Sequence, residues 1–470
     1  MTTHQADRVR LSDLFRDGHA SAVLVLCGGF LLAAMTMYIT SALMPSVVAE
    51  IGGQELYALP TTVYVVVSVI GVMSVSQLLA RLGPRGAYLL AFATYVIGAA
   101  ICALAPTMPA LLVGRGIVGF GGGLLSGLGY AVVRSALPSR LWSPATGAIS
   151  AMFGIGTLIG PVLGGLFAQF GAWRLAFGLI ALLGVVLGVL APRALERRAT
   201  GVQTEPVPIL AVALLASAIG LLSVASVIDG QLKTMLIIAA ALLVIAFLAR
   251  DRSAPFAVFP RSTYRRGSAL RWVLLTNALT TVAIVSEAFA PLFGQRMAGL
   301  TPLVAGFFAA AVSVGWSAFG LLGARVSGAR WRGRLTIIGP ALLAVGLLIT
   351  ALTQAEPASP QRAALWFILL IIAGAGIGFS FPNISFATLS TVPKSEAGKA
   401  GAAIPMVGLI GQSFGSALAG VLVNLGLPSM PHAATNLFLG LAVLAGIGTI
   451  TAAIAVRRGA FTDGAEPPVG

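Results

Sequence analysis

The sequence predicts an all-α polytopic membrane protein. Of its 470 residues, 58% are hydrophobic and 9% are charged. The apolar residues gather in runs of about 20, the length that a helix needs to cross the hydrocarbon of a bilayer. Backbone that faces lipid must satisfy its own hydrogen bonds, so these runs must form helices. The net charge of +15 comes from short basic clusters between the runs, a pattern that indicates membrane topology and not a nucleic-acid surface.

The apolar runs follow one another as six, then two, then six. We expect a cytoplasmic tail at 1–20, a six-helix bundle at 21–192, a linker with two additional transmembrane helices at 193–268, a second six-helix bundle at 269–456 and a cytoplasmic tail at 457–470. Twelve spans remain an alternative, in which 207–249 is a re-entrant or interfacial element. The fourteen predicted spans are 21–44, 58–80, 87–105, 108–133, 145–170, 174–191, 207–228, 232–249, 269–293, 301–324, 335–353, 363–388, 399–425 and 433–456.

Lysine and arginine indicate the orientation of these spans. With the N-terminus inside, almost all of the 29 basic residues fall on the cytoplasmic side, as the positive-inside rule requires. Because the number of spans is even, both termini are expected in the cytoplasm. The exceptions are Arg174, Lys233, Arg296 and Arg362 outside, and Arg115 within a span.

The span at 145–170 has an unusual composition for an apolar helix, because it contains Gly156, Gly160, Pro161, Gly164 and Gly165. Small residues four apart let two helices approach closely. Proline removes one backbone hydrogen bond and favours a kink. This span is therefore predicted to bend and to pack tightly against its neighbours.

Two further patterns carry basic residues. The loop after the second span contains Arg81, Gly83 and Arg85, and the fourth span contains Arg115. An arginine within the membrane costs roughly 2.5 kcal/mol or more on insertion scales, and it therefore usually faces a cavity or a partner. The alternative for Arg115 is a side chain that snorkels from near the outer end of its helix.

In their order and spacing these patterns resemble the major facilitator superfamily. The span at 145–170 is similar to its fifth-helix antiporter motif, the 81–85 loop to its loop signature, and the surroundings of Arg115 to its fourth-helix motif. With fourteen spans and the pair Trp173-Arg174, the chain is identified as a member of the drug:proton antiporters of the EmrB/QacA type. The resemblance implies two six-helix bundles plus two extra central helices, and a hinge-and-seal role for the glycine-rich span. One departure is Ala80, where the loop signature has an acid.

An acid within a span is the candidate for proton coupling. Only Glu287, of the 14 acidic residues, lies well inside a predicted span. A carboxyl group in hydrocarbon favours its neutral form, so it can carry a proton from one side to the other. The acid that the family often has in span one is missing, and Thr36 and Tyr38 stand in that region. Coupling is therefore assigned to Glu287 with Arg115 as helper, and the alternative is a protonated structural glutamate.

A pocket for a lipophilic molecule needs aromatic walls and a few polar anchors. Membrane aromatics also face lipid or other helices, and amides also join helices by hydrogen bonds, so both alternatives stay open. The candidates for substrate binding are Tyr38, Thr36, Tyr64, Tyr130, Phe153, Phe289, Trp316, Phe381, Asn383, Gln412 and Asn277.

The expected function is proton-coupled efflux of drugs or toxic compounds by alternating access. An enzyme is not expected, because the sequence has no P-loop, metal-ligand cluster or Ser/His/Asp set. The expected partners are a lipophilic small molecule, protons as the coupling ion and membrane lipids, with no cofactor and no nucleic acid. We expect a monomer in the cytoplasmic membrane of a bacterium, with or without accessory export proteins. The alternative is a transporter of one specific metabolite or lipid.

Overall fold

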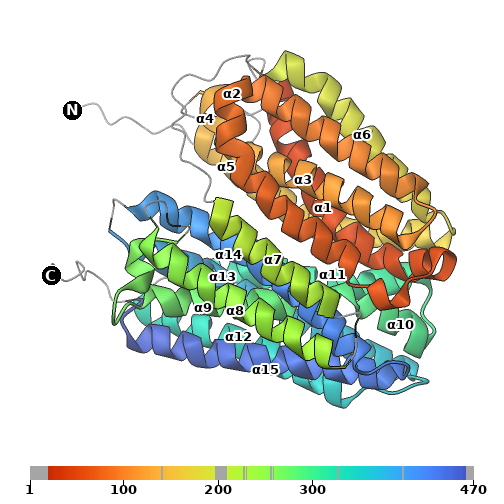
Figure 1. Cartoon of the computed structure of the whole chain (residues 1–470). Coiled ribbons are helices and arrows are strands. Elements are labelled where there is room, and N and C mark those ends of the chain that lie inside the picture. The colour runs from red at the N-terminus through yellow and green to blue at the C-terminus, as the bar shows by residue number, and fades with distance from the viewer. Residues whose placement is uncertain are drawn as a thin grey trace, which may run out of the picture. The chain divides into compact units, whose positions relative to one another are not determined.

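The computed structural model describes residues 19–138, 141–195, 209–225, 228, 230–254, 257, 259–324, 326, 328–393 and 396–461. Within these residues every regular element is a helix and none is a strand (Figure 1). The predicted all-α class is therefore confirmed. Of the two predicted tails, 19–20 and 457–461 belong to the described residues.

The described residues from 19 to 195 include six α-helices and a short 3₁₀ element. They cover the first six predicted spans, except that α1 extends past the predicted end at 44 to Ile51 and the second and third spans are joined in α2. The elements are α1 (Ala20–Ile51), η2 (Gln54–Leu56), α2 (Leu59–Leu104), α3 (Met108–Ala131), α4 (Val133–Ala136), α5 (Trp142–Gln169) and α6 (Trp173–Ala194).

The rest of the chain forms the two additional helices and those of the second predicted bundle. The predicted ninth span is not one helix, because it is divided among three elements. The elements are α7 (Ile209–Ala225), α8 (Gln231–Ser253), η4 (Arg261–Tyr264), α9 (Leu270–Ile284), η5 (Val285–Ala288), α10 (Ala290–Ala298), α11 (Pro302–Ala324), α12 (Ala329–Leu352), α13 (Pro360–Ser390), α14 (Ala397–Asn424) and α15 (Met430–Arg457).

The apolar helices of the described residues fall into a long set and a short set. Among the described residues, 12 helical segments are long and apolar enough to cross a membrane, and two apolar segments are shorter, Gly154–Gln169 in α5 and Ala213–Ala225 in α7. Each of the fourteen predicted spans thus coincides with helix, but the length criterion is met by 12. A multi-pass membrane protein follows, and the count of fourteen stays a prediction.

Helix α2 holds two predicted spans that meet at Gly83. The residue has φ 69° and ψ 175°, which breaks the helical geometry, and Pro84 follows it directly. A positive φ suits glycine because other residues place a Cβ against the backbone there. The predicted short basic loop is therefore a sharp glycine kink that carries Arg81 and Arg85 on its two sides.

By its contacts the chain divides into two compact units. Unit 1 comprises 1–37, 67–160 and 174–207, and unit 2 comprises 38–66, 161–173 and 208–470. Unit 2 therefore holds α7–α15 together with one end of α1, α2 and α5. The predicted bundle borders at 192 and 268 stay predictions.

Glycines set the close helix crossings inside each unit. In unit 2, a Cβ on Gly376 of α13 would collide with the carbonyl oxygen of Gly339 in α12. In unit 1, a Cβ on Gly114 of α3 would lie 2.7 Å from the Cys102 sulfur. Helices that lack side chains at the crossing can bring their backbones together, which is how membrane helices gain packing contacts in lipid.

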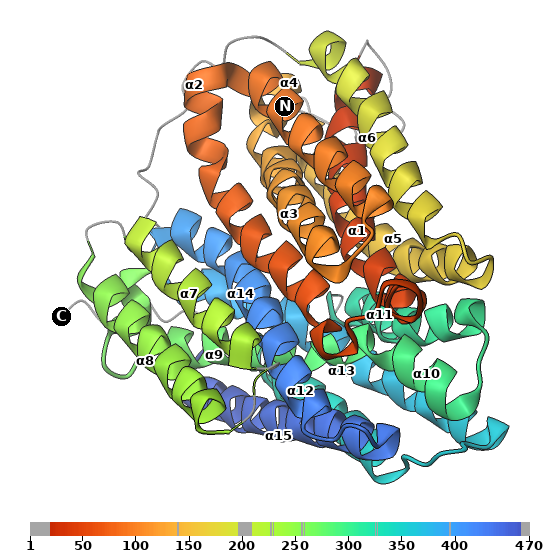
Figure 2. The same ribbon diagram turned by 45° about the vertical axis from the view of Figure 1, so that its right-hand side comes forward.

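The two additional helices, α7 and α8, pack within unit 2. They contact each other along their length, and α7 also contacts α14 (Figure 1, Figure 2). The segment that follows α8 is held by Asp251, which is 1% exposed in the last turn of α8. Its carboxylate accepts hydrogen bonds from the Phe259 amide at 3.2 Å and from the Tyr264 hydroxyl at 2.7 Å.

The segment after α8 is also tied to α14. Glu396, the N-cap of α14, accepts hydrogen bonds from the Ser262 amide at 3.1 Å and from the Ser262 hydroxyl at 2.5 Å. Burial, and then the hydrogen bond to Asp251, raise the pKa of Tyr264 above its ordinary value, so its hydroxyl stays protonated and donates at neutral pH. Two carboxylates thus anchor one short segment to two helices.

Replacing Asp251 with alanine is expected to lower stability. The change removes two hydrogen bonds to a charged acceptor and leaves the buried Phe259 amide without its partner, which costs about 2–4 kcal/mol. A thermal melt of the purified protein in detergent measures the effect. Glu356→Gln is the control, because Glu356 is exposed. Equal melting temperatures for Asp251→Ala and wild type would show that the anchor contributes nothing.

Candidate functional site

Glu287 lies where the ninth predicted span changes its geometry. Pro291 has no N–H to donate to the Glu287 carbonyl four residues earlier, so an α-helix cannot continue there. The chain instead forms the 3₁₀ element η5, in which the Phe289 amide donates to the Ser286 carbonyl at 3.3 Å. The break sets the Glu287 side chain between α9 and α10.

The carboxyl group of Glu287 is buried and incompletely hydrogen-bonded. Its side chain is 6% exposed, and its Oε2 has no hydrogen-bond partner among the described residues. Tyr38 of α1, which is 3% exposed, lies close enough to interact with it electrostatically. A buried oxygen without a partner is costly, so this site is suited to a proton or to a donor from a bound molecule.

Aromatic rings line the chain next to Glu287. The Phe289 ring lies 5.0 Å from that of Tyr57 and 6.3 Å from that of Phe293, between ring centres, and Phe293 lies 5.8 Å from Phe438. Of these, the sequence predicted only Phe289. Tyr57 was missed because it stands between the first two spans, where nothing in the sequence places it beside the ninth.

Two predicted amides, Asn277 and Gln412, lie on helices that pack together. The Asn277 side chain donates from Nδ2 to the Ile404 carbonyl of α14 at 3.2 Å, which is the interhelical hydrogen bond predicted as the alternative. Asn277 Oδ1 and Gln412 Oε1 have no partner among the described residues. Both free atoms are acceptors, so together with Glu287 they offer hydrogen bonds to a molecule that carries donors.

The other predicted residues of unit 2 lie on α2, α11 and α13. Tyr64 of α2 is 3% exposed. Trp316 and Phe381 form an edge-to-face pair with ring centres 5.7 Å apart. Asn383 is 2% exposed and donates to the Phe379 carbonyl of its own helix at 2.8 Å, which satisfies the amide locally.

In unit 1, Arg115 is completely buried in α3, with 0% of its side chain exposed. It lies close enough to Cys102 to interact with it electrostatically. Thr36 hydrogen-bonds to the Tyr95 hydroxyl, which also donates to the Leu32 carbonyl at 3.0 Å. Thr36 therefore joins α1 to α2.

The remaining two candidates of unit 1 are aromatic. Tyr130 is 43% exposed and packs edge-to-face on Phe30, with ring centres 5.5 Å apart. Phe153 belongs to α5, but its side chain lies outside the described residues.

The glycines of α5 pack against two different helices. A Cβ on Gly156 would lie 2.7 Å from the Ala34 Cβ of α1, and one on Gly164 would lie 2.5 Å from the Ile39 carbonyl of the same helix. Gly160 is buried in the same helix, next to Pro161. The predicted close packing of this helix is confirmed.

On its other side, α5 contacts α11 within unit 2. A Cβ on Gly165 would lie 2.7 Å from the Pro302 carbonyl and 3.2 Å from the Gly306 Cα, and one on Gly306 would lie 2.5 Å from the Pro161 carbonyl. Gly306 was missed in the sequence because one glycine in an apolar span does not reveal its partner.

The ends of α2 and α14 are also joined in unit 2. The Thr62 hydroxyl donates to the Ser416 hydroxyl at 2.7 Å, which in turn donates to the Ala58 carbonyl at 3.2 Å. The Asn424 side chain donates to the Glu55 carbonyl at 3.0 Å. These hydrogen bonds join α14 to the start of α2 and to η2.

Long apolar helices that pack through glycine define a multi-pass helical membrane protein, and a buried acid lies at a helix break within it. The chain belongs to the Major Facilitator Superfamily, whose family model matches residues 26–416. The predicted resemblance to this superfamily is therefore confirmed.

Curated relatives extend along almost the whole chain. A probable multidrug-efflux transporter of Mycobacterium tuberculosis is 40% identical over 444 residues, covering 93% of this chain and 94% of that protein. Multidrug resistance protein 3 of Bacillus subtilis is 24% identical and covers 85% of this chain and 78% of its own length.

Solved structures share the fold. A peptide transporter in complex with sulfate has a TM-score of 0.70 at 14% identity, covering 94% of this chain and 96% of its own. A D-xylose-proton symporter has a TM-score of 0.67 at 16% identity, covering 93% and 97%. At this identity the likeness concerns the fold alone.

Proposed function

We propose that the protein exports lipophilic small molecules in exchange for protons, as a multidrug efflux transporter of the cytoplasmic membrane. The observation that carries the proposal is Glu287, a buried acid with an unpartnered oxygen at a helix break. The proposal is supported by two relatives of this chain, one named a probable multidrug-efflux transporter and the other multidrug resistance protein 3.

In this mechanism Glu287 takes up a proton from the outside and releases it to the cytoplasm. The neutral acid is the stable form while the site is closed to water, and the charged form is favoured when water reaches it. Moving one charge down a potential of about 100 mV supplies about 2.3 kcal/mol, and a pH gradient adds to it. That free energy drives export of a substrate that binds when the proton leaves.

The substrate in this proposal binds next to Glu287. Phe289 and Tyr57 provide aromatic surface, and the free acceptor atoms of Asn277 and Gln412 lie on the adjoining helices α9 and α14. A lipophilic molecule that carries a hydrogen-bond donor matches this combination. Arg115 is assigned to coupling as a helper from α3.

The contacts between α5 and α11 and between α2 and α14 close one end of the pathway. By the distribution of basic residues this is the predicted outer end. Alternating access requires the Gly165–Gly306 and Thr62–Ser416 contacts to separate and re-form in each cycle. With the termini and basic loops in the cytoplasm, the protein works as a monomer in this scheme.

The test is substrate-induced proton movement. Purified protein is reconstituted in liposomes that contain a pH-sensitive dye, an artificial pH gradient is applied, and lipophilic drugs are added one at a time. We expect some drugs to accelerate the decay of the gradient beyond that in protein-free liposomes. Drug transport that leaves proton flux unchanged would contradict coupling, and the absence of any transport across a broad drug panel would contradict efflux.

A further inference from the structure

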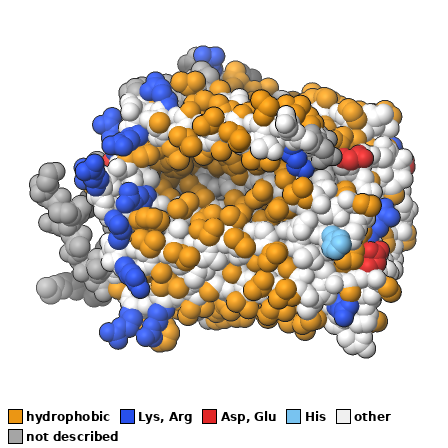
Figure 3. Space-filling model, turned by 60° about the horizontal axis from the view of Figure 1, so that its bottom comes forward, with side chains coloured by type: hydrophobic (Ala, Val, Ile, Leu, Met, Phe, Trp, Pro, Cys, Tyr) orange, Lys and Arg blue, Asp and Glu red, His pale blue; other side chains and the backbone are white. Residues whose placement is uncertain are grey.

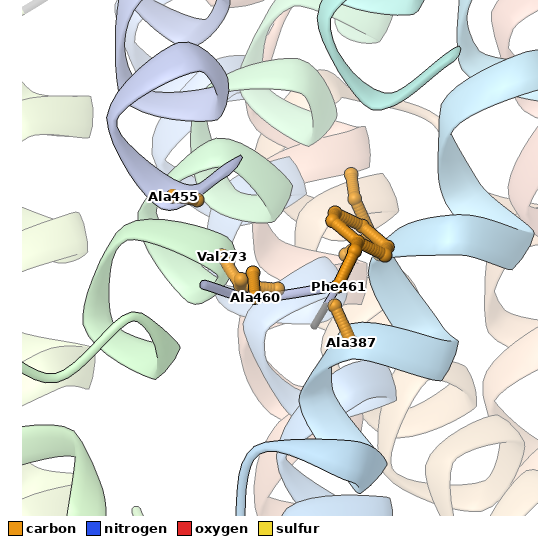
Figure 4. Packing of buried hydrophobic residues seen from close by; sticks show 6 residues of the cluster. Val273, Ala387, Ala455, Ala460 and Phe461 are labelled. Carbon is orange, nitrogen blue, oxygen red and sulfur yellow. The ribbon is translucent and has the colours of Figure 1, made fainter. Parts of the chain in front are cut away.

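One end of unit 2 is built on a small apolar cluster. The chain turns at Gly459, which has φ 83°, and the Ala460 amide donates back to the Ala455 carbonyl at 3.1 Å. Phe461 is thereby buried against the ends of α9, α13 and α15 (Figure 4). The start of α12 joins this cluster, because a Cβ on Gly333 would lie 3.2 Å from Val456 and 3.7 Å from Phe461. We call this cluster, formed by Val273, Ile384, Ala387, Ala455, Ala460 and Phe461, the platform.

Arginines and aromatic rings surround this platform. Trp272, which packs against the cluster, carries two guanidinium groups: the Arg271 Cζ lies 5.4 Å and the Arg458 Cζ 6.0 Å from its ring centre. On α12, the Arg334 Cζ lies 5.0 Å from the ring centre of Trp331. Figure 3 shows Lys and Arg side chains gathered along one edge of the face it draws.

Two of the donors at this place lack an acceptor within the described part of the chain. Trp272 Nε1 and Arg271 Nε are both shielded from water, and neither has a hydrogen-bond partner among the described residues. A guanidinium that stacks on a ring keeps its N–H edge available. Buried donors without partners are rare and costly, and adjacent ones on a cationic site call for an anion with several acceptor oxygens.

We propose that Arg271, Arg458 and Trp272 bind the phosphate of an anionic phospholipid headgroup. A phosphate diester offers the oxygens that two guanidinium groups and an indole N–H require. A lipid, and not a free phosphate, is the occupant because apolar side chains are exposed along the helices that lead from the site. On α12 and α15 they include Ile338, Val345, Ile447 and Ile450, which are 41–61% exposed and offer a surface for acyl chains.

The test compares lipids of equal chain length on the detergent-solubilised full chain. Native mass spectrometry counts bound phosphatidylglycerol and phosphatidylcholine as each is titrated. We expect wild type to bind phosphatidylglycerol at least about tenfold more tightly, and the double variant Arg271→Gln/Arg458→Gln to lose most of that preference. Binding should weaken as salt increases. Equal binding of the two lipids by wild type would overturn the proposal.

The control is Arg296→Gln/Arg362→Gln, in which two exposed arginines of α10 and α13 are changed. This control variant should retain the preference for phosphatidylglycerol. If it loses the preference as well, the effect depends on net charge alone, and the proposed site is wrong. Arg271→Lys/Arg458→Lys keeps the charge but not the planar fork, so intermediate affinity is expected. If the Gln double variant fails to fold, Arg458→Gln alone replaces it, because Arg458 is exposed at a helix end. Displacement of the lipid by millimolar inorganic phosphate would identify a free-phosphate site instead.

Discussion

Glu287→Gln is expected to abolish proton-coupled efflux while the protein still folds and inserts. Glutamine keeps the size and the hydrogen-bonding capacity of a protonated glutamate but cannot release a proton. The initial rate of drug-induced proton flux in liposomes should fall at least about tenfold, which corresponds to about 1.4 kcal/mol in the rate-limiting barrier. In an efflux-deficient bacterial host, the variant should leave drug susceptibility at the level of the empty vector.

The matched control is Glu356→Gln, because Glu356 is an exposed acid outside the helices. It should transport like wild type. Drug binding to Glu287→Gln, measured by equilibrium dialysis in detergent, separates coupling from recognition: binding that persists without pH dependence identifies Glu287 as the proton carrier. Transport by Glu287→Gln with the pH dependence of wild type would refute this assignment.

Gly165→Leu is expected to stop transport through the packing of α5 on α11. The Cβ alone would lie 2.7 Å from the Pro302 carbonyl oxygen, which belongs to backbone and cannot rotate away. Overpacking of this kind costs about 1–3 kcal/mol and would hold the two helices apart. We expect drug efflux to fall at least about tenfold, with normal amounts of protein in the membrane by immunoblot.

Gly178→Leu in α6 provides the control, because a Cβ there meets no atom within 4 Å. Gly165→Ala should give an intermediate loss, since it introduces the same Cβ without the branched side chain. Wild-type efflux by Gly165→Leu would mean that the α5–α11 contact plays no part in the transport cycle. An equal loss of efflux in Gly178→Leu would mean that any added leucine damages the protein.

The helices were predictable because each span must satisfy its own backbone hydrogen bonds in lipid. Each span therefore appears in the sequence as a run of about 20 apolar residues. The interruption around Gly83 was predicted as a short basic loop, and its form as a kink within α2 was not predicted. The break at η5 was not predicted, although its signal was present: Pro291 denies the Glu287 carbonyl its usual donor. A proline near a span end is common, so its position relative to Glu287 became informative only with the structure.

The partners of the site could not be read from one sequence. Gly165 was predicted to pack closely, but its partner Gly306 lies more than a hundred residues away and has no distinguishing pattern of its own. Tyr57 and Asp251 stand at the edges of spans, where their burial depends on other segments. Long-range contacts of this kind follow from how helices pack, and periodicity carries no information about them.

The anchoring of α8 by Asp251 and of the following segment by Glu396 bears on how such a chain could gain or lose helices. Excising 209–253 would remove the acceptor of the Tyr264 hydroxyl and the Phe259 amide, and would uncover the side of α14 that α7 contacts. A shorter homologue without these two helices would therefore need different residues at both cut ends and on α14 at the same time. The additional pair is thus built into the architecture of unit 2, and fluorescent labels attached to α7 or α8 would follow the movements of unit 2.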